Sequence, residues 1–204
     1  PFQRVGLEFV VESNGRMLLG DGTGLGKTWQ SVAYAEYMRY ENPRFQTICA
    51  IKAANIANWR REIKNLTGIE APVECYTSKP DGISVAQVVI SRSPYVIISY
   101  DTLGARYKGE EVQDLNGDIE TNLYPWAQIF QTSKPDLIIL DEAHQIKNYG
   151  THRWKGIRDL VSTPHILSLS ASFILNRVPE FWTNLHLNDP ESWKSFDKFK
   201  DTYT

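Results

Sequence analysis

Short apolar runs alternate with longer amphipathic segments along most of the chain. The apolar runs predict buried strands at 17–19, 45–51, 73–76, 95–100, 165–169 and within 136–144, where the run ends in acidic residues. The intervening segments predict helices at 1–10, 28–40, 54–66, 123–131, 154–161 and 179–187. Residues 85–90 fit either a helix or a strand. Val5, Phe9 and Val10 lie on one side of the first predicted helix, and Trp59, Ile63 and Leu66 are predicted on the inner side of the helix at 54–66. Strands that alternate with helices indicate an α/β fold with a mostly parallel sheet and helices on both faces.

Composition narrows the class of protein. The 204 residues, of which 42% are hydrophobic, suffice for one sizeable α/β domain or two small ones, and no linker divides them. We therefore expect a single domain over 1–204. The net charge of −2 excludes a global basic field, so any surface for nucleic acid must be local. The acidic stretch 104–122 predicts a solvated surface insertion.

The cysteines and the absence of certain signals predict an intracellular protein. Cys49 and Cys75 lie in apolar runs and are expected to be reduced core residues. We see no signal peptide and no apolar run that could span a membrane, so we expect no membrane partner. The Cys and His residues show no metal-ligand spacing.

A glycine-rich segment between a strand and a helix has the layout of a phosphate-binding loop. Its backbone N–H groups and the start of the following helix favour a bound phosphate. Lys27 would reach the β and γ phosphates, and the Thr28 hydroxyl would bind Mg²⁺. Asp21 stands where the strict pattern has glycine. The predicted ATP-binding residues in this segment are Gly22, Thr23, Gly24, Leu25, Gly26, Lys27 and Thr28.

Two acids follow a buried strand and belong to the same predicted sheet edge as the loop. In open α/β sheets, ligands bind at the carboxyl ends of the strands. Asp141 is therefore predicted to hold Mg²⁺, and Glu142 to polarise an attacking water. His144 fits two interpretations, a relay between nucleotide state and a second domain or a structural histidine.

A glutamine precedes the loop by the length of one helix and a turn. The amide of Gln3 presents a donor and an acceptor, which suits the edge of an adenine ring. Without other evidence, a glutamine near a terminus is interpreted equally well as an ordinary surface residue.

Several blocks, in this order, resemble the first motor lobe of the Swi/Snf-related DNA-translocating ATPases of helicase superfamily two. They cover almost the whole chain: 1–6 resembles the adenine-sensing motif, 21–28 motif I, 58–62 the end of motif Ia, 97–103 motif Ib, 141–148 motif II with its Lys-Asn tail, and 169–182 motif III with the helix after it. The resemblance implies a RecA-like fold, ATP and Mg²⁺ as cofactors, and ATP hydrolysis that drives movement on double-stranded DNA.

The resemblance also implies roles for further residues. Lys52, Ser99 and Thr102 fall in the motifs that track a DNA backbone. His144, Ser170 and Ser172 fall in the motifs that couple nucleotide state to movement. The family's second lobe supplies an arginine finger across the cleft, and we expect that lobe to lie outside residues 1–204. We therefore expect the chain to bind ATP with Mg²⁺ and to hydrolyse it poorly by itself.

Three departures from the family pattern leave other functions open. Lys52 replaces a proline, Gly22-Thr23 replaces an acid-methionine pair, and 170–173 reads Ser-Ala-Ser-Phe where Thr-Gly-Thr-Pro is usual. An RNA helicase or a restriction-type motor lobe is one alternative. A degenerate nucleotide-binding switch or scaffold is the other, favoured by the altered motif III.

Overall fold

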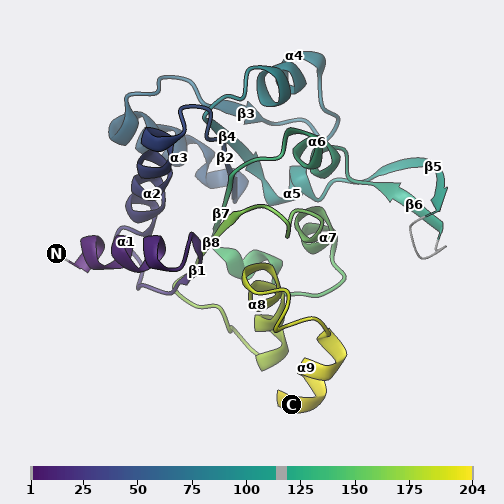
Figure 1. Cartoon of the computed structure of the whole chain (residues 1–204). Helices are drawn as coiled ribbons and strands as arrows, with labels where there is room; N and C mark the ends of the chain where they lie inside the picture. The colour runs from purple at the N-terminus through teal and green to yellow at the C-terminus, as the bar shows by residue number, and fades with distance from the viewer. Residues whose placement is uncertain (1, 114–118, 204) are drawn as a thin grey trace.

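A six-stranded parallel sheet forms the centre of the molecule (Figure 1). The computed structural model describes residues 2–113 and 119–203, and for 107–113 and 119–123 it describes the backbone alone. In spatial order the strands are β1 (Arg16–Leu19), β8 (His165–Leu169), β7 (Leu137–Asp141), β2 (Thr47–Ile51), β4 (Tyr95–Ser99) and β3 (Val73–Cys75). Every pairing in this sheet is parallel, so all the carboxyl ends meet at one edge. The predicted α/β fold is confirmed.

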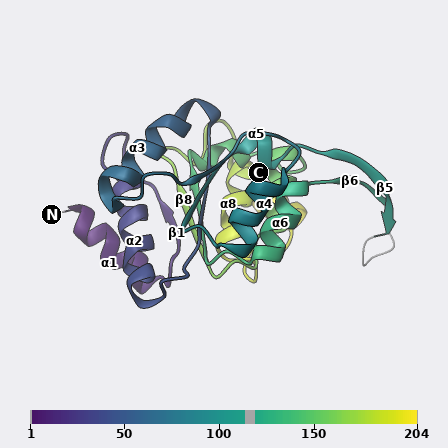
Figure 2. The ribbon, with the colours of Figure 1, turned by 90° about the horizontal axis from the view of Figure 1, so that it is seen from above.

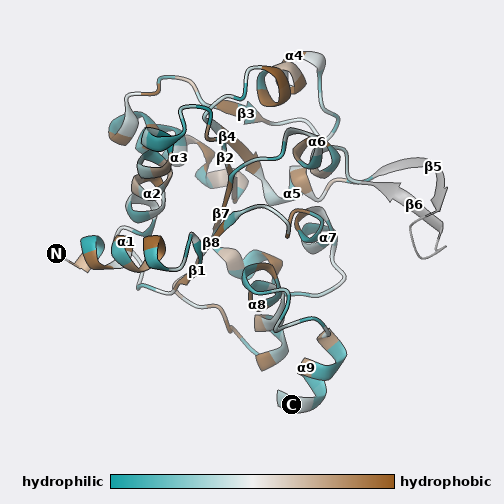
Figure 3. Ribbon diagram, viewed as in Figure 1, coloured by the Kyte–Doolittle hydropathy of each residue, from teal (hydrophilic) through white to brown (hydrophobic). Residues whose placement is uncertain are grey.

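Helices cover both faces of the sheet, as Figure 2 shows from above. One face packs against α1 (Phe2–Glu12), α2 (Lys27–Glu41) and α3 (Ile56–Thr67). The other packs against α5 (Tyr100–Leu103), α6 (Pro125–Ser133), α7 (His152–Arg158), α8 (Trp182–Asn188) and α9 (Phe196–Tyr203). The strands β2, β4 and β8 are buried at every position, which is the pattern of a parallel sheet covered on both sides (Figure 3).

Shorter helical turns join these elements. They are α4 (Gly82–Val85), which continues as a π-helical turn (Ala86–Ile90), and the 3-10 turns η1 (Ala53–Asn55), η3 (Ala143–Ile146) and η4 (Val178–Phe181). The ambiguous segment 85–90 is therefore helical. β5 (Tyr107–Gln113) and β6 (Ile119–Leu123) form an antiparallel hairpin that projects from the body of the molecule in Figures 1 and 2. The predicted insertion 104–122 covers this hairpin except for its last residue, Leu123, which was predicted to begin a helix. The side chains of most of the insertion lie outside the described residues.

Several boundaries and faces differ from the predictions. The helix predicted from 54 begins at Ile56, because 53–55 forms a 3-10 turn first. Leu66, predicted on the inner side of that helix, is 37% exposed near its C-terminal end. On α1, Val10 is buried but Val5 and Phe9 are half exposed, because the side of α1 that packs on the core carries Leu7 and Val10 instead. Cys49 and Cys75 are buried and free, as predicted.

A partly buried arginine ties the first strand to the end of the chain's last β–α unit. Arg16 donates to the carbonyls of Thr163 at 2.6 Å, Asn188 at 2.9 Å and Val161 at 3.2 Å, and also to that of Leu187. Burial lowers the pKa of this guanidinium, and Asp189 opposes that shift. Arg16 thereby fixes β1, whose far end leads into the glycine-rich loop. Among the described residues, no helix combines the length and apolar character needed to cross a bilayer.

Candidate nucleotide-binding site

The glycine-rich loop joins β1 to α2 at the carboxyl edge of the sheet. Gly24 and Gly26 have φ angles of +75° and +82°, a region in which side chains are strained, and Gly26 directly precedes the first turn of α2. Lys27 Nζ donates to the carbonyls of Asp21 at 2.6 Å and Gly22 at 2.9 Å. The ammonium group is thus held against the loop.

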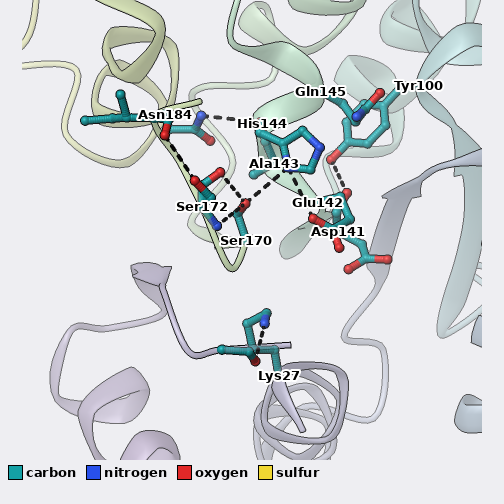
Figure 4. Close-up of polar contacts among 12 residues, drawn as sticks. Lys27, Tyr100, Asp141, Glu142, Ala143, His144, Gln145, Ser170, Ser172 and Asn184 are labelled. Atoms are coloured by element: carbon teal, nitrogen blue, oxygen red, sulfur yellow. Dashed lines mark hydrogen bonds and ion pairs between the residues drawn. The ribbon is translucent and has the colours of Figure 1, made fainter. Parts of the chain in front are cut away.

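The structure brings Lys27 and Asp141 to one cleft, although 113 positions separate them in the sequence. The cleft has a volume of about 390 Å³. Figure 4 shows Lys27 at the start of α2, facing the segment that carries Asp141 and Glu142. The cleft is lined by Thr23, Gly24, Gly26, Lys27, Thr28, Trp29, Asn58, Glu62, Asp141 and Glu142. Loop, metal-binding candidates and acidic pair therefore share one site, and α3 contributes to its wall.

Two aromatic side chains fix the end of β7. Trp59 of α3 donates from Nε1 to Asp141 Oδ2 at 2.9 Å, and the Tyr100 hydroxyl donates to the Asp141 carbonyl at 2.8 Å. Burial raises the pKa of Tyr100 well above its ordinary value, and the charges of Asp141 and Glu142 add to this, so the hydroxyl stays a donor. The sequence predicted that Trp59 faces the core but gave no sign of its hydrogen bond to Asp141.

His144 connects motif II to motif III (Figure 4). Glu142 has a φ of +52°, and its Oε2 lies 3.2 Å from His144 Nδ1. The same nitrogen lies 3.2 Å from Ser170 Oγ. Ser170 donates its hydroxyl proton to the Ser172 carbonyl at 2.8 Å, so His144 Nδ1 must carry the hydrogen that reaches Ser170 and Glu142. The three residues predicted to couple the motifs are therefore joined by hydrogen bonds.

The imidazole of His144 stays neutral near pH 7. Burial lowers its pKa and outweighs the opposing effect of Glu142, while Lys52 and Lys147 lower it further. The contact between His144 and Glu142 is therefore a hydrogen bond from a neutral ring to a carboxylate.

The tails of motifs II and III also meet. Lys147 Nζ lies 3.0 Å from Glu180 Oε1, and the other oxygen of Glu180 accepts from the backbone N–H groups of Leu175 and Asn176. Burial would raise the pKa of Glu180, but the hydrogen bond from Lys147 and the two backbone donors together lower it. Asn184 of α8 donates to the Ala143 carbonyl at 3.3 Å. These contacts hold the segment after motif III against motif II.

Gln3 lies at the loop, beside Gly26. A Cβ at Gly26 would collide with the Gln3 amide, so the two residues touch. Gln30 was not predicted from the sequence: it is fully buried on α2 and donates from Nε2 to Asp21 Oδ2 at 2.9 Å. This contact gives the unusual Asp21 a structural partner that no motif indicated.

The predicted DNA contacts lie at the same sheet edge with different accessibility. Lys52 is exposed at the end of β2. Ser99 is 4% exposed and caps α5 by accepting from the Thr102 N–H, and its hydroxyl donates to Thr102 Oγ1 at 2.8 Å. Thr102 is partly exposed. On α3, Arg60 and Lys64 form ion pairs with Glu74 and Glu70.

A known protein family matches almost the whole length of the chain. The model of the SNF2-related domain matches residues 2–204. The chain belongs to the SNF2-related domain family. The predicted resemblance to this family and the RecA-like fold are thereby confirmed, and nucleotide binding is a property of this family.

Relatives and a solved structure are much longer than this chain. A SWI/SNF-related matrix-associated actin-dependent regulator of chromatin subfamily A-like protein 1 from Xenopus tropicalis is 30% identical over all of the chain, which covers 19% of that protein. The Caenorhabditis elegans homolog is 25% identical over all of the chain and 26% of its own length. The Sulfolobus solfataricus SWI2/SNF2 ATPase core in complex with dsDNA has a TM-score of 0.71 at 20% identity, with 98% of this chain and 38% of that chain covered. The chain therefore spans about a fifth to a quarter of these two relatives.

Proposed function

We propose that residues 1–204 are the ATP-binding first lobe of a DNA-dependent ATPase that moves on double-stranded DNA when joined to a second RecA-like lobe. The observation that carries this proposal is the cleft in which Lys27 of the loop faces Asp141 of β7. Family membership and the similarity to a SWI2/SNF2 core bound to dsDNA support the choice of DNA. An intracellular location is part of the proposal, since ATP and DNA are encountered there.

The cleft residues have distinct roles in this proposal. The loop N–H groups and Lys27 bind the β and γ phosphates, and Gln3 contacts the adenine edge. Thr28 and Asp141 hold Mg²⁺, and Glu142 accepts a proton from the attacking water. Mg²⁺, when bound, neutralises charge on the transferred phosphoryl group. His144, Ser170 and Ser172 transmit the nucleotide state through the hydrogen bonds that already join them.

The charge of the cleft supports a metal-bound nucleotide. Among its described lining residues, Lys27 is the one cation against the carboxylates of Glu62, Asp141 and Glu142. A free triphosphate would be repelled by this acidic wall, whereas a divalent cation between them reverses the interaction. Mg²⁺ is commonly held by one or two carboxylates together with substrate phosphates, which the pair Thr28 and Asp141 allows.

Lys52 is the principal DNA contact in this proposal. It is exposed at the edge of the sheet, and Thr102 is the more accessible of the two hydroxyl candidates, because Ser99 is buried and caps α5. Contacts to phosphate groups give binding that is independent of sequence and weakens with salt.

The change Lys27→Ala tests the nucleotide site. The variant loses a charge-assisted hydrogen bond to phosphate, worth about 1.5–3 kcal/mol, so its ATP affinity in Mg²⁺ is expected to fall about 10- to 100-fold. Isothermal titration calorimetry measures this. Lys198→Ala, which removes an exposed cation on α9, is the control and should bind ATP as the unchanged chain does. Equal ATP affinity in the Lys27 and Lys198 variants contradicts the proposal.

A nucleotide-operated switch is the second candidate function. It is favoured by Ala171 and Phe173, which replace the flexible glycine and rigid proline usual in motif III. Such a switch binds ATP through the same cleft but does not use hydrolysis to move. Glu142→Gln in the full-length protein separates the two, because it keeps the residues proposed to bind ATP and removes the carboxylate proposed to accept a proton from the attacking water. A motor then loses its cellular activity, whereas a switch that needs only bound ATP keeps it.

A further inference from the structure

A buried tryptophan contacts the carboxylate proposed to hold Mg²⁺. Trp59 is 1% exposed and lies on α3, in the core on the same side of the sheet as α2. Its Nε1–H donates to Asp141 Oδ2 at 2.9 Å. Asn58 and Glu62, its neighbours on α3, line the cleft itself. The indole thus contacts Asp141 from the core, while Asp141 also lines the cleft.

This contact restricts the orientation of the carboxylate. The last torsion of an aspartate side chain has a broad, roughly two-fold preference, so it is poorly fixed by its own geometry. An indole has a single N–H donor, and it occupies one oxygen of Asp141. The other oxygen is left for the metal ion or its water, in a fixed direction. Partners that orient metal ligands in this way commonly change metal affinity or activity by about 10- to 100-fold when removed.

We propose that Trp59 is a positioning residue for magnesium binding: its indole N–H orients the Asp141 carboxylate toward the metal of the bound nucleotide. This inference rests on the proposed function, because it requires that Mg²⁺ and ATP bind in this cleft. It assigns to α3 a part in metal binding that is separate from the predicted DNA contacts at Lys52.

Trp126 offers a matched control. It is also 1% exposed, and its Nε1–H also donates one hydrogen bond, to the Thr77 carbonyl at 2.8 Å. It lies on α6, in the core on the opposite face of the sheet, and does not line the cleft. Changing either tryptophan to phenylalanine removes one buried indole donor and leaves an aromatic ring. A purely structural effect should therefore be similar in the two variants.

The experiment compares the gain in ATP affinity that magnesium produces. Isothermal titration calorimetry gives the dissociation constant of ATP in excess EDTA and in excess MgCl₂, and their ratio is the metal-dependent gain. We expect this ratio to be about 10-fold smaller in Trp59→Phe than in the unchanged chain, with affinity in EDTA little altered. Trp126→Phe should keep the full ratio. The indole ¹H–¹⁵N resonances of the unchanged chain give a second measurement: adding MgCl₂ to the ATP-bound chain should shift that of Trp59 and not that of Trp126.

The outcomes distinguish a failure of the proposed function from a failure of the proposed role of Trp59. If the unchanged chain binds no ATP, or Lys27→Ala binds it equally well, the proposed function fails and the role of Trp59 fails with it. If ATP binding depends on Lys27 and on magnesium but the metal-dependent gain is equal in Trp59→Phe and Trp126→Phe, only the role of Trp59 is overturned. If Trp59→Phe does not fold, the indole resonances of the unchanged chain provide the test. A Trp59 resonance that does not shift when MgCl₂ is added to the ATP-bound chain overturns the inference.

Discussion

At the scale of single residues, His144 links two motifs that lie 26 positions apart. The His144 side chain is 18% exposed. Its ring contacts Glu142 in motif II and Ser170 in motif III. A charged ring there is disfavoured by burial and by the nearby charges of Lys52 and Lys147, and favoured by Glu142 and Asp141. Because burial is the largest of these effects, the neutral form is the one that joins the motifs at neutral pH.

This neutral histidine predicts a pH-dependent stability. Its pKa in the folded chain lies below the ordinary value of 6.5, so the unfolded chain binds the proton more readily. The stabilisation is complete above about pH 6.5 and is lost as the pH falls through the lower folded value. His144→Gln keeps a donor but does not titrate. We expect the unchanged chain to lose more unfolding free energy than this variant between about pH 7.5 and pH 5, as measured by urea denaturation.

Subtracting the unfolding free energy of His144→Gln from that of the unchanged chain removes the contribution of every titrating group that the two proteins share. Above about pH 7 the difference between them should be constant, since His144 is neutral in both the folded and unfolded states there. A difference that shifts in favour of the unchanged chain on acidification would show that the Glu142 carboxylate outweighs burial, and it would contradict the neutral link.

The sequence predicted some site residues and missed others for a physical reason. Loop glycines, Lys27 and Asp141 could be predicted because strand–loop–helix order and strand-end acids fix their places before any packing is known. Gln30 and Trp59 could not, because helical periodicity shows that a side chain is buried but not which atom its polar group meets. Trp59 was predicted to face the core, which is correct, and its bond to Asp141 follows only from how α3 packs.

At the scale of elements, α1 and the glycine-rich loop are in direct contact. Two loop glycines have nearly the same backbone strain but different surroundings: Gly26 faces the Gln3 amide of α1, whereas a Cβ at Gly24 would meet nothing within 4 Å. The pair therefore separates the effect of a positive φ from the effect of the contact between α1 and the loop.

Replacing these glycines by alanine should have unequal effects on ATP binding. At Gly24 the cost is the strain of a positive φ, about 1–2 kcal/mol. Gly26→Ala adds a similar strain and displaces the Gln3 amide, which is the flexible end of a side chain, so the two variants should lose similar unfolding free energy in urea. ATP binding should weaken more in Gly26→Ala, because Gln3 is moved from its place beside the loop. Gln3→Ala should then add little to the loss of ATP affinity in the Gly26→Ala background. Equal ATP affinity in the two glycine variants, or full additivity of Gln3→Ala and Gly26→Ala, would contradict the contact.

The order of elements could be predicted, but not how they are arranged. All six strands of the central sheet were predicted, because each contains or borders a short run of apolar residues. Their spatial order was not, since neighbours such as β1 and β8 are brought together by crossovers that leave no mark in the local pattern. The hairpin β5–β6 was predicted only as a charged insertion, because charge there obscured any alternation typical of strands.

At the scale of the whole molecule, the cleft lies at the carboxyl edge of the central sheet. The lining residues in the described part of the chain include Lys27 but no arginine. In related motors a second lobe is expected to close over such a cleft and supply an arginine to the transferred phosphoryl group. That arginine contributes about 10³- to 10⁵-fold to the rate, which is about 4–7 kcal/mol of barrier.

This difference predicts binding without efficient turnover. In the proposed function the loop, Thr28 and Asp141 hold ATP with Mg²⁺, so the chain should bind the nucleotide. Hydrolysis by the 204 residues alone should nevertheless be slow and little stimulated by double-stranded DNA. Steady-state release of inorganic phosphate measures this, with Lys27→Ala as the background. Joining the chain to the second lobe of a family member should raise the DNA-stimulated rate by orders of magnitude, because that lobe is expected to supply the arginine. Robust DNA-stimulated turnover by the chain alone would mean that its own residues stabilise the transferred phosphoryl group, and the division of labour between two lobes would then be wrong.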